Sequence, residues 1–224
     1  MKRLDNAPEL LDGPLDTELL AGNLRDLARV NRWLGGAALS RNAIAPLAVA
    51  SSAPTVLDVG TGAGDIPRFL AARVKVIVTA IDIRPEIVSS ATANLRGSAV
   101  NVRVGRLDEE PDRSHDVVHA SMVLHHIEPG EAGDFLRKAA RVAREAVVIN
   151  DLDRGWRWFL GAWLIARIAT RNPYTRHDGP LSVRRAYTAD EVVAMARRAG
   201  LRPVARYHSR PGYRYALVFV HGGD

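Results

Sequence analysis

The segment of residues 56–65, Val-Leu-Asp-Val-Gly-Thr-Gly-Ala-Gly-Asp, constrains the fold more than any other part of the chain. Its apolar start predicts a buried strand. Glycines at positions 60, 62 and 64 let the backbone turn tightly and approach a ligand closely. A helix that follows such a turn points its free N–H groups at that ligand. The segment therefore predicts an α/β fold with a small-molecule site at the carboxyl end of its first strand.

A second apolar run, residues 74–81, ends in Asp82. An acidic residue at the tip of the second strand is well placed to accept hydrogen bonds from the two hydroxyls of a ribose. The ligand is therefore predicted to carry a nucleoside. A dinucleotide site would need glycine at position 65, where this chain has Asp65.

The pattern from residue 55 onward alternates strands and helices. Apolar strands without polar alternation predict a parallel sheet that is covered on both faces. The expected strands are 55–60, 75–81, 100–105, 115–120 and 146–150, and the expected helices are 66–73, 85–94, 131–143 and 189–199. Residues 16–50 also have helical spacing, which Gly35 and Gly36 interrupt.

The pattern D-x-G-x-G-x-G at residues 58–64 resembles motif I of class I S-adenosylmethionine (SAM)-dependent methyltransferases. Residues 115–127 resemble the fourth strand of that family and its loop, residues 146–151 the fifth strand, and residues 201–220 the terminal antiparallel hairpin. The resemblance implies a Rossmann-like doubly wound sheet of about seven strands, a methyltransferase activity and SAM as the cofactor.

Two further segments, 150–154 and 178–188, resemble small bacterial methyltransferases of the ubiquinone/menaquinone and phenolic-lipid type. This second resemblance implies a small, apolar phenolic or quinone-like acceptor, O-methylation and a place in secondary metabolism. A nucleic-acid methyltransferase acting on rRNA or tRNA, and a SAM-binding protein without enzymatic activity, are the alternatives.

The family resemblance assigns most of the expected cofactor contacts. Asp58 holds the amino end of SAM, and Asp82 holds the ribose with Ile83 against the adenine. The glycine-rich turn lines the methionine and ribose through Gly60, Thr61, Gly62 and Gly64. The family's acidic residue after the third strand is either displaced here to Asp108 or absent, and backbone groups of Arg106 and Leu107 are the alternative contacts at the adenine. Ser121 and Arg32 complete the set; for Arg32 the expected contact is the cofactor carboxylate, and an ordinary surface position is the alternative.

Two histidines, His125 and His126, follow the fourth strand. The resemblance pairs the second of them, His126, with Asp151 after the fifth strand, as a base and its orienting carboxylate. A packing or capping role for His126 is the alternative. His177, next to Asp178, is a further candidate. No metal is expected, because His115 and His119 on one strand are about 13 Å apart.

The chain is expected to divide into a helical cap over residues 1–50 and a SAM-binding domain over residues 51–224, with a lid at residues 151–187. Three of the four tryptophans lie in this lid. Its helix, residues 156–168, is expected to bring Trp156, Trp163 and Ile168, with Phe159 one turn along from Trp156, to the ligand crevice. Ordinary packing on the sheet, or a dimer contact, is the alternative.

The formal net charge of +6 comes from 31 basic and 25 acidic residues. The arginines are dispersed and are not interleaved with aromatic residues, so nucleic acid is not the favoured partner. The absence of cysteine suits a reducing compartment, and residues 1–5 lack the apolar stretch of a signal peptide. A cytoplasmic protein is therefore expected. No apolar run reaches the length of a membrane-spanning helix, although a transient contact with a membrane surface is compatible with this sequence.

Overall fold

A computed structural model describes residues 1–50 and 53–223. The expected domain boundary at residue 51 lies outside the described residues. The described residues form a seven-stranded sheet of order β3-β2-β1-β4-β5-β7-β6. Its strands are β1 (Thr55–Val59), β2 (Ile77–Asp82), β3 (Val100–Val104), β4 (His115–Ser121), β5 (Ala143–Leu152), β6 (Leu201–His208) and β7 (Arg214–His221).

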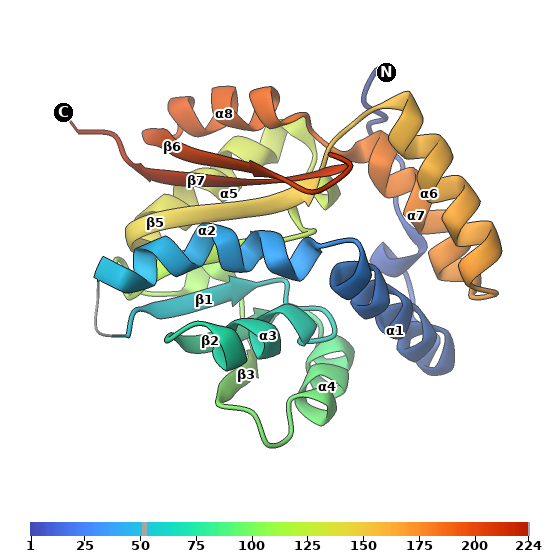
Figure 1. Ribbon diagram of the computed structural model, residues 1–224, viewed down its shortest axis with the longest axis horizontal. Coiled ribbons are helices and arrows are strands. Elements are labelled where there is room, and N and C mark those ends of the chain that lie inside the picture. The colour runs from blue at the N-terminus through green and yellow to red at the C-terminus, as the bar shows by residue number, and fades with distance from the viewer. Residues whose placement is uncertain (51–52, 224) are drawn as a thin grey trace.

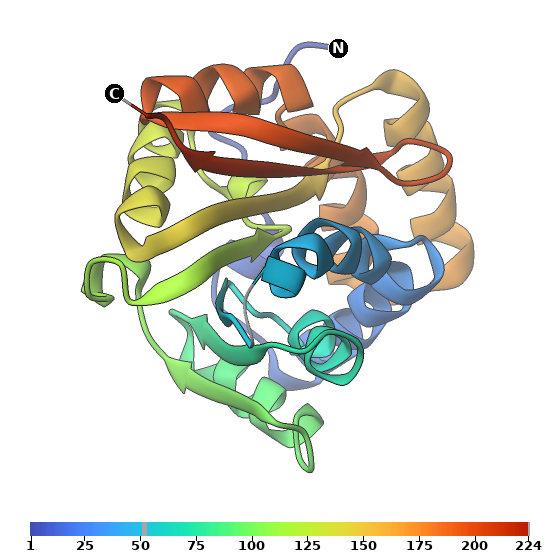
Figure 2. The ribbon, with the colours of Figure 1, turned by 60° about the vertical axis from the view of Figure 1, so that its left-hand side comes forward.

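The sheet is parallel from β3 to β5 and antiparallel at β7 and β6. Figure 2 shows the terminal hairpin lying beside β5. The Rossmann-like α/β architecture with an antiparallel terminal hairpin is thus confirmed. The order places the glycine-rich turn after the central strand β1, where the order of the strands reverses and ligands bind in such sheets.

The α-helices of the described residues are α1 (Thr17–Trp33), α2 (Gly36–Ala50), α3 (Asp65–Arg73), α4 (Pro85–Asn94), α5 (Pro129–Val142), α6 (Trp156–Ala169), α7 (Pro173–Arg185) and α8 (Ala189–Arg198). Three short 3₁₀ turns, η1 (Leu10–Asp12), η2 (Leu107–Glu109) and η3 (Leu124–His126), lie in its loops. Most of the expected elements agree with the observed ones to within two residues. β5 is the exception, because it begins three residues earlier than expected, at Ala143, which pairs with His115 of β4.

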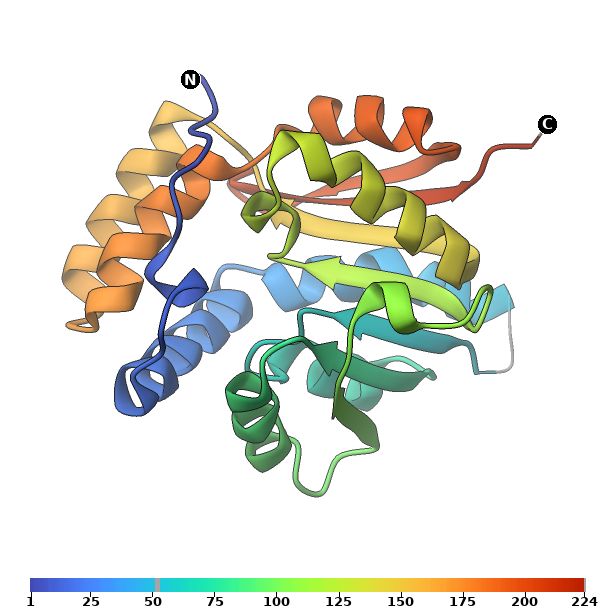
Figure 3. The same ribbon diagram turned by 180° about the vertical axis from the view of Figure 1, so that it is seen from behind.

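Helices cover both faces of the sheet (Figures 1 and 3). On one face, Leu39 and Ile44 of α2 and Leu70 of α3 pack on apolar side chains of the central strands. On the other face, Leu136 of α5 and Val192 of α8 do the same. The expected cap over residues 1–50 therefore has two parts with different positions, because α2 is a layer of the core. The division into domains stays a prediction.

α1, α6 and α7 gather at one end of the sheet, where the parallel strands have their carboxyl ends (Figure 1). Residues 177–180, which belong to the expected lid, lie inside α7. The helix tolerates Pro180 because its start is capped by Asn172 Oδ1, which accepts from Tyr174 N at 2.9 Å, and because one face is buried.

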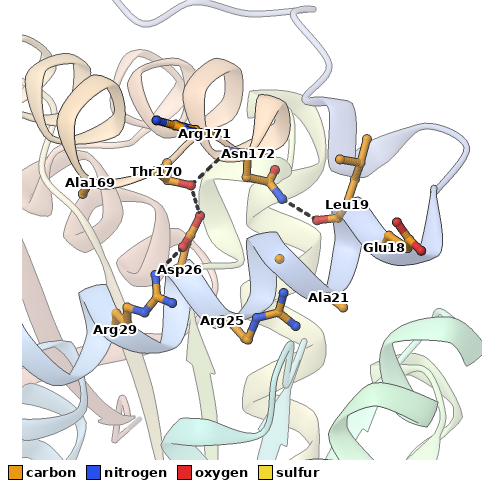
Figure 4. A pocket seen from close by; sticks show the side chains of 11 residues that line it. Glu18, Leu19, Ala21, Arg25, Asp26, Arg29, Ala169, Thr170, Arg171 and Asn172 are labelled. Atoms are coloured by element: carbon orange, nitrogen blue, oxygen red, sulfur yellow. Dashed lines mark hydrogen bonds and ion pairs between the residues drawn. The ribbon is translucent and has the colours of Figure 1, made fainter.

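Hydrogen bonds join α1 to the linker between α6 and α7 (Figure 4). Asn172 Nδ2 donates to Leu19 O at 2.7 Å, and the hydroxyls of Thr170 and Thr175 donate to Asp26 Oδ2 at 2.5 and 2.9 Å. A side chain at Gly22 would meet Asn172, since an added Cβ would lie 2.5 Å from its Nδ2 atom. These contacts fix the three helices to one another beside the ligand edge of the sheet.

Candidate functional site

The glycine-rich turn has the geometry that the sequence predicts. Gly60 and Gly62 have φ angles of +69° and +54°, which favour glycine. A Cβ on Gly60 would lie 2.5 Å from Val123 Cγ2, whereas a Cβ on Gly62 would meet no atom within 4 Å. The turn is thus packed against the loop after β4 on one side and open at Gly62, where a ligand can approach its backbone.

Thr61 and Asp82 are the polar side chains beside this turn. Thr61 Oγ1 is buried and has no hydrogen-bond partner among the residues that the structure describes. Asp82 is buried as well, and its Oδ1 accepts from Arg84 N at 3.1 Å. Burial raises the pKa of Asp82. Both side chains can therefore form further hydrogen bonds beside the open backbone of Gly62. A ligand that carries hydroxyl groups fits such a site.

The residues expected at the adenine differ in their exposure to solvent. Ile83 is exposed, which leaves it free to cover a flat ring. The Arg106 side chain is exposed and pairs with Asp108, while Leu107 is buried in the core. Arg32 is also exposed, on α1, where it lines a depression together with Gly64 and Asp65.

Asp58 at the end of β1 is buried, and a histidine already occupies its carboxylate. His119 Nδ1 lies 2.6 Å from Asp58 Oδ1, and its Nε2 lies 2.8 Å from Ser40 Oγ. Ser40 also accepts from Asn150 Nδ2 at 2.7 Å. The expected cofactor contact of Asp58 therefore belongs to a chain of buried hydrogen bonds that runs from β1 through β4 to α2 and β5.

Arg214 is the centre of this buried network. Its side chain is 0% exposed, and its three nitrogens donate to Asn150 Oδ1, Asn31 Oδ1 and Ser121 Oγ, each at 2.7 Å. Asn31 in turn donates to Asp65 Oδ2 at 3.0 Å. One guanidinium thus fixes α1, β4 and β5 around the glycine-rich turn, and it engages the hydroxyl of Ser121 that was expected at the cofactor.

The predicted pairing of His126 with Asp151 is wrong. Asp151 pairs with His125, whose Nδ1 lies 2.7 Å from Asp151 Oδ1 and whose backbone N–H donates to Asp151 Oδ2 at 3.2 Å. The reason is the turn η3, which directs the first histidine toward β5 and the second toward the N-terminal segment. Burial acts to raise the pKa of Asp151, but His125 outweighs it and the pKa is lowered.

His126 contacts the N-terminal segment. Its Nδ1 lies 3.0 Å from Asp12 Oδ1, and its Nε2 lies 3.8 Å from Glu9 Oε2. Glu9 is buried and also accepts from Ser182 Oγ at 2.8 Å. Glu9, His125 and His126 have ligand-type atoms that all lie within 4.8 Å of one another. Sequence reasoning missed this cluster because Glu9 is far from the histidines along the chain.

The contact between His126 and Asp12 is expected to make stability depend on pH. Burial acts to lower the pKa of His126, but the carboxylates of Glu9 and Asp12 outweigh it and the pKa is raised. The stabilisation is therefore complete below the unfolded-state pKa of about 6.5 and is lost as the pH rises through the higher folded-state pKa. The difference in melting temperature between the native protein and His126→Gln should shrink on going from about pH 6 to about pH 9. A constant difference would contradict this assignment.

His177 has a neighbouring partner, since its Nδ1 lies 2.7 Å from Asp178 Oδ1. Asp178, however, mainly fixes the N-terminal segment, because its two oxygens accept from Leu10 N and Leu11 N at 2.8 and 3.1 Å. The His177 side chain is 51% exposed. The structure thus gives Asp178 a structural role and leaves His177 at the surface of α7.

The aromatic face of α6 differs from the prediction. Trp156, Trp163 and Ile168 were expected at the crevice, but all three are exposed. Of the expected set only Phe159 points inward, and Trp158 does so as well; both pack near Leu152 and Met122. The helix is apolar on both faces, and its spacing alone does not say which face packs inward.

Sequence reasoning also missed the buried network, although it left a signal. Arg214 directly precedes the apolar run Tyr-Ala-Leu-Val-Phe-Val, and His119 directly follows Val117 and Val118. Such charged or titratable residues are rarely buried without partners. Their partners Asn31, Ser40 and Asn150 come from three other elements, so only the folded chain identifies them.

Residues 56–146 match the model of a family described as a methyltransferase domain. No curated protein matches the chain. Among solved structures, a SAM-dependent methyltransferase from Aquifex aeolicus is 21% identical, with a TM-score of 0.64 over 93% of this chain and 100% of the other. Human N-acetylserotonin methyltransferase in complex with SAM is 15% identical, with a TM-score of 0.70 over 93% and 57%. Magnesium protoporphyrin IX methyltransferase from Synechocystis PCC 6803 with bound SAH is 18% identical, with a TM-score of 0.57 over 94% and 90%.

These structures share the fold, and the matched family model covers β1 to the start of β5, which includes the glycine-rich turn, Asp82 and both histidines of η3. The open backbone at Gly62 and the unpartnered hydroxyl of Thr61 agree with a cofactor at this position. Residues 56–146 thus match a methyltransferase domain, and the chain has the Rossmann-like fold of the SAM-dependent methyltransferases to which it is similar.

Proposed function

We propose that the protein methylates a hydroxyl group of a small apolar acceptor of phenolic or quinone-like type. The observation that carries the proposal is the buried pair of His125 and Asp151, which lies where β4 and β5 end. An imidazole that a carboxylate orients through Nδ1 keeps Nε2 available as a proton acceptor. A hydroxyl acceptor needs such a base, because it must lose a proton as it gains the methyl group.

Apart from removal of this proton, methyl transfer requires few catalytic groups from the protein. When bound, SAM would supply a methyl group that its sulfonium has already activated. The chain therefore has to align acceptor and donor and exclude water. We assign the exclusion of water to the N-terminal segment, because Glu9 lies 3.8 Å from Nε2 of both histidines and is itself buried.

We assign the cofactor as the resemblance suggests, with one addition. Gly60, Thr61 and Gly62 are placed along the methionine and ribose, and Asp82 at the ribose hydroxyls. The addition is Arg214, whose network holds Asp58 and Asp65 in place on the two sides of this turn. Arg214 thereby acts as a positioning residue and not as a contact of the reacting atoms.

Replacement of Asp82 by alanine is expected to weaken SAM binding at least about tenfold. The ribose would lose two charge-assisted hydrogen bonds, each worth roughly 1.5–3 kcal/mol. Titration calorimetry with SAM and with its demethylated product measures the change, and Asp134→Ala is a control because that side chain is exposed on α5. An unchanged affinity in Asp82→Ala would remove Asp82 from the cofactor site.

The apolar nature of the acceptor is supported by the side chains around the ends of β4 and β5. Met122, Trp158, Phe159 and Tyr213 form one apolar cluster there. Tyr213 contributes its ring and donates its hydroxyl to Leu34 O at 3.0 Å, so its polar end is satisfied elsewhere. An acceptor that approaches the histidines from this side meets hydrophobic surface, as small-molecule sites commonly provide.

The proposal is tested by measuring methyl transfer from labelled SAM to a series of alkylated phenols and hydroquinones, with their methyl ethers and bulk tRNA and rRNA as comparisons. Turnover of the free phenols and not of the methyl ethers is the expected result. Transfer to RNA alone would replace this function by the nucleic-acid alternative. Transfer to carbon of the blocked ethers would show that no hydroxyl is the target.

A further inference from the structure

The outer face of α6 is an apolar stripe with nothing packed on it among the described residues. Trp156, Leu160, Trp163 and Leu164 are spaced i, i+4, i+7 and i+8, so they share one side of the helix. All four are exposed, and Ile168 at the end of the helix is 76% exposed. The opposite side, with Trp158 and Ala166, packs inward. Soluble monomers seldom expose a continuous patch of this kind without a partner.

The charge around this stripe has one sign. Between Asp153 and Asp178 the sequence contains five arginines and no acidic residue. Arg157, Arg167 and Arg171 are exposed, and no ion pair in the described part of the chain involves them. Two of them lie over tryptophan rings, with Arg157 4.2 Å from the ring centre of Trp158 and Arg167 5.4 Å from that of Trp163.

Arg25 of α1 continues the basic surface. It is exposed and lines, with Arg29 and Arg171, the depression between α1 and the linker after α6 (Figure 4). Arg29 pairs with Asp26, but Arg25 and Arg171 belong to none of the ion pairs found in the described ranges. Three arginines and two acidic residues, Glu18 and Asp26, line this depression, so its charge beside the C-terminal end of the apolar stripe is net positive.

We propose that α6 is a docking surface for an anionic lipid membrane, with the helix lying in the plane of the membrane surface. Tryptophan and leucine on one side with arginine at its borders is the composition of helices that bind at this interface. The place of α6 agrees, since it forms the outer edge of the molecule with α7 behind it (Figures 1 and 3). Among the described residues no helix is long and apolar enough to cross a membrane.

This surface also deepens the proposed function, on which the following step rests. The inner side of the same helix packs near Met122, beside the ends of β4 and β5. A helix with its outer face in lipid and its inner face at the acceptor side would let an apolar phenol pass from the membrane to the histidines without crossing water.

The binding is tested on the intact protein without SAM or acceptor, so its result is independent of the methylation assay. The protein is centrifuged with vesicles of phosphatidylglycerol and, separately, of phosphatidylcholine. Binding to phosphatidylglycerol vesicles with a blue shift of tryptophan emission is expected, as is a strong decrease between about 0.05 and about 0.5 M NaCl. Absence of binding to phosphatidylglycerol vesicles at the lower salt concentration would overturn the proposal.

Variants decide whether α6 is responsible. Leu160→Glu should reduce partitioning at least about tenfold, because it removes apolar area and adds repulsion. Ile77→Glu, at an exposed apolar residue of β2, is the matched control and should leave binding unchanged. The double variant Arg157→Gln/Arg167→Gln should abolish the preference for phosphatidylglycerol. Equal losses in Leu160→Glu and Ile77→Glu, or a dimer that Leu160→Glu dissociates without lipid, would overturn the proposal, as would binding to RNA with no binding to vesicles.

Discussion

Replacing Arg214 by methionine should lower the free energy of unfolding by about 2–5 kcal/mol. The substitution keeps much of the side-chain volume but removes three donors from a site that water does not reach. The oxygens of Asn31 and Asn150 then have no donor, and a buried acceptor without a partner costs about 1–3 kcal/mol. A decrease of about 5–15 °C in melting temperature is expected for a chain of this length.

Urea unfolding of the two proteins measures this loss. Arg206→Met is the matched control, because Arg206 is exposed and its partner Asp190 is more exposed still, so the change should stay below about 1 kcal/mol. Arg214→Lys should recover little, since an ammonium group cannot reproduce the flat three-way contact of the guanidinium. A loss in Arg214→Met as small as that in Arg206→Met would mean that the network does not hold the site together.

The folding pattern was predictable where local chemistry decides it. The glycine-rich turn needs positive φ angles at Gly60 and Gly62, and the sequence supplies glycine there. α4 begins at Pro85, which fits the first turn of a helix, and the expected bounds of this helix were correct. These features depend on residues that are close together in the chain, so the sequence alone predicts them.

The details of the site were predictable only in part, because they depend on contacts across the fold. The sequence placed His125, His126 and Asp151 at the same edge of the sheet, which the structure confirms. It did not say which histidine meets Asp151, because that depends on one short 3₁₀ turn. Nor did it indicate that Glu9 and Asp12 would lie beside the second histidine.

The lid shows a different limit. Both sides of α6 carry large apolar residues, so helical spacing does not distinguish the packed side from the exposed one. The sequence also did not indicate the helix α7, since glycine and proline, here Gly179 and Pro180, usually interrupt helices. A capped start and buried residues on one face, Tyr174 and Val183 among them, outweigh that local preference.

The loss of the His125 imidazole should have the largest effect on turnover. His125→Ala is expected to lower kcat by about 10²-fold or more for a phenolic acceptor, because general base catalysis contributes typically 10²–10⁴-fold. The affinity for SAM should change little, since His125 contacts Asp151 and not the glycine-rich turn. The amount of labelled product formed from labelled SAM at fixed times gives kcat, and calorimetry gives the affinity for SAM.

Three comparisons separate a base from a merely structural residue. Asp151→Asn should cause a smaller loss of kcat, because the amide still accepts or donates one hydrogen bond but no longer stabilises the protonated imidazole. His177→Ala is the matched control, because this histidine also pairs with an aspartate at 2.7 Å but lies half-exposed on α7, and the variant should keep the activity of the native protein.

A more acidic phenol, already ionised at the assay pH, should recover most of the rate of His125→Ala, since no proton then has to be removed. If that acceptor reacts as slowly as the others, or if SAM affinity falls in parallel with kcat, His125 holds the site in shape and the base lies elsewhere.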